Sequence, residues 1–131
     1  MQQIFDECLY TTELENSLQV MRNLKLNADI CCKMITATEF FTKVRQYWPN
    51  FCASFHQNCK TKDTDICRCE SILQAITEQK SLPIPYILTR RVNGTIPADG
   101  CHRMYVCEQL FGPDTKFPVL IITPTKKEDT I

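Results

Sequence analysis

The stretch Phe117-Pro118-Val119-Leu120-Ile121-Ile122-Thr123 carries the clearest information about the fold of this chain. Large apolar and β-branched residues at this density are typical of a β-strand. Because neighbouring side chains of a strand point to opposite faces of its sheet, the unbroken run 119–122 is apolar on both faces. We therefore expect this strand to be central in a sheet, or to be covered on both sides.

Further strands are predicted just before it, in the last third of the chain. Residues 86–92 (Tyr-Ile-Leu-Thr-Arg-Arg-Val) suit a strand, and Asn93-Gly94 directly after them is a favoured type I′ hairpin turn. A short return strand at Thr95-Ile96 is expected to end at Pro97. Residues 104–107 (Met-Tyr-Val-Cys) are predicted as another strand.

The first two thirds of the chain carry the spacing of helices. Thr12-x-x-Glu15 and Thr36-x-x-Glu39 are capping-box patterns, and each is followed by apolar residues three and four positions apart. Pro49 is expected to stop the second of these helices.

Two more helices and one loop complete the predicted order. A short helix is expected after Asn27 or Asp29, and another begins at Asp65. Residues 50–65 are expected to form an irregular loop. The prediction is an α+β fold, in which a helical N-terminal two thirds packs on a small antiparallel sheet or hairpin in the C-terminal third. At 131 residues, one cysteine-rich domain spanning 1–131 accounts for the chain.

Cysteine is the unusual residue of this composition, with nine in 131 positions. All nine are candidates for disulfide bonds: Cys8, Cys31, Cys32, Cys52, Cys59, Cys67, Cys69, Cys101 and Cys107. The adjacent Cys31 and Cys32, and likewise Cys67 and Cys69, are expected to bridge different partners. Nine is odd, so one thiol stays free or links two chains as a homodimer. This pattern predicts a disulfide-stapled protein of an oxidising, extracellular compartment.

A reducing compartment is the alternative, with the thiols free or holding zinc. The chain has no Cys-x-x-Cys pair, but an irregular site made of Cys52, His56, Cys59 and Cys67 stays open. The opening residues carry no export signal, so the secreted interpretation expects a mature form from which a leader has been removed. Asn93-Gly94-Thr95 is a glycosylation sequon, which makes Asn93 a candidate for modification.

Charge and composition exclude several classes of function. Lys plus Arg and Asp plus Glu both number 15, so the basic excess of a nucleic-acid binder is missing. No apolar run approaches the roughly 20 residues of a membrane span. Three glycines are too few for a glycine-rich phosphate cradle. His56 and His102 are expected at the surface or in loops. We therefore expect no catalytic residues, no cofactor and no bound metal.

A protein-binding role is the function that these features favour. Tyr47 and Trp48 are candidate aromatic anchors for a partner, and Arg90, Arg91 and Arg103 are a candidate positive patch. We expect a secreted, non-enzymatic protein that binds a receptor or target as a ligand or inhibitor. The alternative is a cytoplasmic interaction or regulatory module with reduced thiols, with or without zinc.

Overall fold

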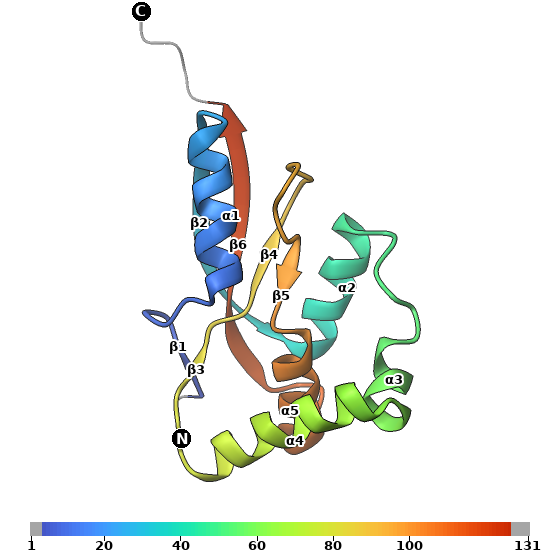
Figure 1. Ribbon diagram of the computed structural model, residues 1–131. Coiled ribbons are helices and arrows are strands. Elements are labelled where there is room, and N and C mark those ends of the chain that lie inside the picture. Colours follow the sequence, from blue (N-terminus) through green and yellow to red (C-terminus); the bar gives the residue numbers. More distant parts are fainter. Residues whose placement is uncertain (1–3, 127–131) are drawn as a thin grey trace, which may run out of the picture.

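The apolar run 119–122 lies in strand β6 (Lys116–Lys126) of the computed structural model, which describes residues 4–126 (Figure 1). This strand is an interior one, because the four-stranded sheet has the order β2-β6-β4-β5. All four residues of the run are buried. The expectation of a central, doubly covered strand is confirmed.

The sheet combines antiparallel and parallel neighbours. The other strands are β1 (Phe5–Asp6), β2 (Leu26–Thr36), β3 (Leu82–Pro83), β4 (Tyr86–Leu88) and β5 (Ala98–Asp99). β2 runs antiparallel to β6 over its whole length, from Leu26 opposite Lys126 to Thr36 opposite Lys116. β4 runs parallel to β6, while β1 and β3 form a separate parallel pair. The prediction of a purely antiparallel sheet is therefore wrong.

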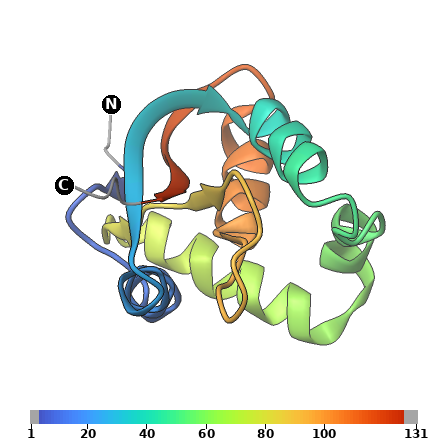
Figure 2. The ribbon, with the colours of Figure 1, turned by 90° about the horizontal axis from the view of Figure 1, so that it is seen from above.

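Five helices are present in the described part of the chain. They are α1 (Thr12–Asn23), α2 (Ala37–Tyr47), α3 (Phe55–Thr61), α4 (Asp63–Thr77) and α5 (Cys101–Phe111). α1 lies alongside β2, whereas α2 contacts β2, β4 and β6 (Figures 1 and 2). α4 contacts both α3 and α5. Helices and strands therefore share one hydrophobic core.

The predicted helix starts agree well with the structure. At α2 the capping box is complete, because Thr36 Oγ1 accepts the N–H of Glu39 at 3.1 Å and Glu39 Oε1 accepts the N–H of Thr36 at 3.4 Å. α1 is capped one residue earlier than expected, by Thr11, whose hydroxyl oxygen accepts the N–H of Leu14 at 3.2 Å. The helix predicted near Asp65 begins at Asp63.

Two segments have the opposite secondary structure to the one predicted. The helix expected after Asn27 or Asp29 is strand β2, because the eleven-residue ladder with β6 outweighs a local cap. The strand expected at 104–107 lies inside α5, and all four of its residues are buried. A short apolar run does not distinguish a buried helix from a buried strand. The loop expected at 50–65 contains α3.

A hairpin forms here, but its strands differ from those predicted: β4 ends at Leu88 instead of residue 92, and the return strand is β5, after Pro97, instead of Thr95-Ile96. β4 and β5 pair antiparallel, with Tyr86 opposite Asp99. The loop 89–97 replaces a two-residue turn, and Asn93 lacks the positive φ that type I′ requires. The phenol of Tyr86 donates to the Ile96 carbonyl at 2.9 Å, and the Ile96 N–H donates to Ser17 Oγ at 3.2 Å. These bonds hold the loop against α1.

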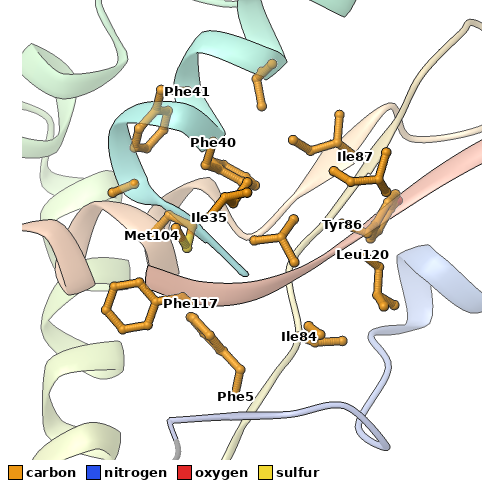
Figure 3. Close-up of a cluster of buried hydrophobic side chains, with 14 of the residues drawn as sticks. Phe5, Ile35, Phe40, Phe41, Ile84, Tyr86, Ile87, Met104, Phe117 and Leu120 are labelled. Atoms are coloured by element: carbon orange, nitrogen blue, oxygen red, sulfur yellow. The ribbon is translucent and has the colours of Figure 1, made fainter. Parts of the chain in front are cut away.

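The core joins residues from the two ends of the chain and from its middle (Figure 3). Phe5 and Phe117 meet edge to face with their ring centroids 5.9 Å apart. Trp48 is buried, and its indole N–H donates to the Leu88 carbonyl at 2.8 Å. Aromatic pairs of this kind add about 0.5–1.5 kcal/mol beyond the burial of their surface.

The disulfide staples predicted from composition are not found. All nine cysteines lie within the described residues and all nine are free thiols. One pair of cysteines approaches to 3.9 Å. This distance is almost twice the length of a disulfide bond, which is about 2.05 Å. The fold is held by its apolar core and its sheet, not by cross-links.

The irregular zinc site drawn from spacing is not assembled either. No group of three or more His, Cys, Asp or Glu side chains that could hold a metal occurs within residues 4–126. His56 instead contacts Glu108 at 3.1 Å, and Cys52 accepts a hydrogen bond from the Asn58 amide at 3.7 Å. Across the same described range, every helix is too short or too polar to cross a membrane.

Candidate anion-binding site at the start of α5

The connection between β5 and α5 places a cluster of polar groups at one end of a helix. β5 ends at Asp99, Gly100 makes the turn, and α5 begins at Cys101. No side chain caps the first turn of α5, in contrast to α1 and α2. The first amides of a helix carry a partial positive charge and are the usual place where proteins bind phosphate or carboxylate.

Gly100 is required by the backbone at this turn. Its φ is +99°, a left-handed conformation that other residues adopt only with strain. A side chain at this position would place a Cβ 2.6 Å from the Cβ of Pro85 and 3.0 Å from Nη2 of Arg103. Gly100 therefore lets Pro85, which directly precedes β4, the start of α5 and the Arg103 guanidinium approach one another closely.

Arg103 has hydrogen-bonding capacity that the protein does not use. Its side chain is only 13% exposed, and its Nε and Nη2 atoms are buried without a hydrogen-bond acceptor among the described residues. The nearest carboxylate oxygen, Oδ2 of Asp99, is 3.7 Å from Nη2, which is too far for a good hydrogen bond. Burial lowers the pKa of Arg103, although the nearby Asp99 opposes this shift. A buried guanidinium without acceptors is costly unless a ligand completes it.

A cavity of about 300 Å³ opens beside these groups. Its lining comes from five elements or their flanking residues: Thr11 and Glu13, Arg68 and Ile72, Leu82 and Pro83, Asp99, and Gly100, His102 and Arg103. Two guanidinium groups and two carboxylates face it, so the lining is polar and mixed in charge. Such a surface suits a ligand that carries both an anionic group and hydrogen-bond donors.

Cys101 lies in the first turn of α5 and is partly buried. Burial, and after it the neighbouring Asp99, raise the pKa of its thiol to about 12. The thiol is therefore protonated near neutral pH, whereas nucleophilic cysteines need the thiolate.

The two histidines are closer together than the sequence suggested. The rings of His56 and His102 both pack against Phe55, with centroid distances of 5.8 and 5.0 Å. Each imidazole contacts a carboxylate: His56 contacts Glu108 at 3.1 Å, and His102 contacts Asp65 at 2.7 Å. The second contact joins α4 to the first turn of α5 and helps to fix the orientation of His102.

The residues predicted to bind a partner do not form one patch. Tyr47 is half-buried and Trp48 belongs to the core, where Arg91 stacks over its ring at 5.6 Å. Arg90 and Arg91 are exposed in the loop after β4, whereas Arg103 faces the cavity at α5. The glycosylation candidate Asn93 is exposed at the tip of the same loop.

Comparison with known proteins does not assign a family. No protein-family model, curated protein or solved structure gives a match to this chain. The function is therefore inferred from the geometry of the site.

Proposed function

We propose that this protein binds a small phosphorylated metabolite of the nucleotide type in the cavity at the start of α5. The observation that carries this proposal is the buried Arg103 guanidinium, which has two nitrogen atoms without acceptors beside an uncapped helix N-terminus. Guanidinium groups match the geometry of phosphate oxygens and bind them through two parallel hydrogen bonds. The backbone amides of the helix start supply further donors.

The carboxylates of the cavity narrow the choice of ligand. Glu13 and Asp99 face the same space as Arg68 and Arg103, so a bare phosphate would meet repulsion as well as attraction. A nucleotide also carries ribose hydroxyls, which donate hydrogen bonds to carboxylates. Its base fits the apolar part of the lining, where Ile72 and Leu82 lie. We therefore expect a nucleotide to bind more tightly than inorganic phosphate.

Calorimetric titration with ADP tests this proposal. The wild-type protein is expected to bind ADP saturably and more tightly than inorganic phosphate. Arg103→Met removes the charge-assisted hydrogen bonds, each worth about 1.5–3 kcal/mol, and is expected to weaken ADP binding about 10- to 100-fold. Arg103→Lys keeps the charge without the planar fork and is expected to be intermediate.

The matched control is Arg90→Met, which removes an exposed guanidinium from the loop after β4. This variant is expected to bind ADP as the wild type does. The proposal is wrong if ADP gives no saturable heat, or if the Arg90 and Arg103 variants weaken binding equally. Thermal unfolding of each variant shows whether the fold is retained.

The secreted, partner-binding role stays a prediction. Its main support was the expected disulfide bonds, and none is found among the nine cysteines. The alternative, an interaction module with reduced thiols, agrees better with nine free cysteines. Intact mass with and without reduction separates the two: four disulfides lower the mass by about eight hydrogens relative to the reduced chain. We expect no difference in mass, and nine thiols that react after denaturation.

A further inference from the structure

The outer edge of the sheet is formed by a long strand without a partner. β2 has eleven residues and pairs only with β6 among the described strands. Apart from that ladder, no described residue makes a backbone hydrogen bond to β2. Figure 2 shows this strand curving along the periphery of the molecule. Its outward N–H and C=O groups are therefore available to a further strand.

The side chains of β2 are also more exposed than those of an ordinary sheet strand. Ile30 is 45% exposed and Met34 is 57% exposed, although both are large and apolar. Cys31 and Cys32, at the middle of the strand, are exposed as well. The Glu7 carboxylate, at 3.6 Å, contacts the Cys32 thiol from the chain before α1. Because strand side chains alternate between faces, Ile30, Cys32 and Met34 share one apolar face of β2, while Asp29, Cys31 and Lys33 share the other.

The sequence of β2 is complementary to itself in one antiparallel register. When two copies pair with Cys31 opposite Cys31, Asp29 of each copy lies opposite Lys33 of the other. Directly opposite residues of antiparallel strands have Cβ atoms about 4.5–5.5 Å apart, a distance at which opposite charges attract. Shifting the register by one residue in either direction places Asp29 and Lys33 opposite uncharged residues. The charge pattern thus selects both the partner and the register.

We propose that β2 is a dimer interface, at which a second copy of this chain adds its own β2 antiparallel and extends the sheet across a two-fold axis at Cys31. The contact is isologous, as in most homodimers, because each copy contributes the same strand. It lies on another element than the cavity at α5, so it neither depends on nor supports the nucleotide proposal.

Sedimentation under reducing conditions is the first test. The wild type is expected as a dimer of twice 15.2 kDa. Lys33→Asp places four carboxylates across the interface and is expected to give monomers. The double exchange Asp29→Lys with Lys33→Asp restores opposite charges and is expected to restore the dimer. Lys60→Asp, the same change at an exposed position of α3, is the matched control and is expected to stay dimeric.

Cross-linking tests the register. Oxidised glutathione converts two Cys31 thiols into one disulfide between the copies, and is itself reduced to two molecules of glutathione. Cys31→Ser is expected to abolish this cross-link, while Cys32→Ser is expected to retain it. A wild type that stays monomeric, a double exchange that fails to restore the dimer, or a cross-link through Cys32 would each overturn the proposal.

Discussion

Gly100 is the residue on which both the turn and the site depend. Two separate constraints act there: the positive φ, and the close approach of Pro85 and Arg103. Gly112 at the end of α5 has a φ of +88° but a ψ of 170°, against 12° at Gly100, and nothing lies within 4 Å of where its Cβ would be. The conflict with Pro85 and Arg103 is therefore particular to Gly100.

Gly100→Ala is expected to lower the free energy of unfolding by more than about 3 kcal/mol. Strain at a positive φ accounts for about 1–3 kcal/mol, and the clash with Pro85 adds to it. Urea denaturation of the variant and the wild type measures the loss. A loss within the range of backbone strain alone would mean that the close approach at Gly100 contributes nothing.

Cys107 links the stability of the protein to alkaline pH. Its thiol is fully buried, and burial raises its pKa from 9.0 to about 12. Because the folded state keeps the thiol neutral, its contribution to stability is complete below pH 9. Above pH 9 the unfolded chain ionises and the folded chain does not, so stability falls as the pH rises from 9 towards 12.

Replacing this thiol is expected to flatten that decline. One such group changes the free energy of unfolding by up to about 1.4 kcal/mol per pH unit. Cys107→Val is expected to lose less stability than the wild type between pH 8 and pH 10.5, as measured by thermal unfolding. Cys52→Val, at an exposed cysteine, is the control and is expected to follow the wild type.

At the scale of elements, the sequence predicts structure that neighbouring residues determine, and it does not predict structure that distant contacts determine. The capping box of α2 is satisfied by residues three positions apart, so the sequence alone was enough to locate it. The doubly apolar run of β6 was equally informative. The prediction is wrong for β2 because that strand is defined by its ladder to β6, in which Cys31 lies opposite Ile121. It is wrong for residues 104–107 of α5 because all four are buried, as they would be in a central strand.

The α2 cap offers a quantitative check on this local argument. Thr36→Ala removes the hydroxyl that accepts the Glu39 N–H, and is expected to cost about 0.5–2 kcal/mol. Thr38→Ala, at an exposed position of the same helix, is the control and is expected to change stability by less than about 0.5 kcal/mol. Chemical denaturation of both variants measures these values. A Thr36 variant as stable as the control would show that the cap is dispensable.

At the scale of the whole molecule, the site is a product of topology. Its lining unites the N-terminus of α1, the middle of α4, β3 and the β5–α5 turn, which are distant in sequence. Three glycines are too few to predict a glycine-rich phosphate cradle from the sequence. At this turn one glycine is enough, because β5 ends directly before α5. The informative signal was the short run Asp99-Gly100-Cys101-His102-Arg103, which a strand assigned to 104–107 concealed.

Cysteine content does not predict cross-links in this molecule. Composition can show that thiols are abundant, but only the fold shows whether any two of them meet. Here Cys59 and Cys107 are buried as small apolar side chains, and five others are exposed. The expectation of a rigid, cross-linked scaffold is therefore wrong, and the apolar core and the sheet hold the fold.

The proposed nucleotide site at the start of α5 is tested most directly by recording backbone amide resonances during a titration with ADP. The account predicts saturable shifts concentrated at the first-turn amides of Cys101, His102 and Arg103 and at the Arg103 Nε–H. Shifts that do not saturate, or that gather in the loop 89–97 instead of at the start of α5, would contradict it.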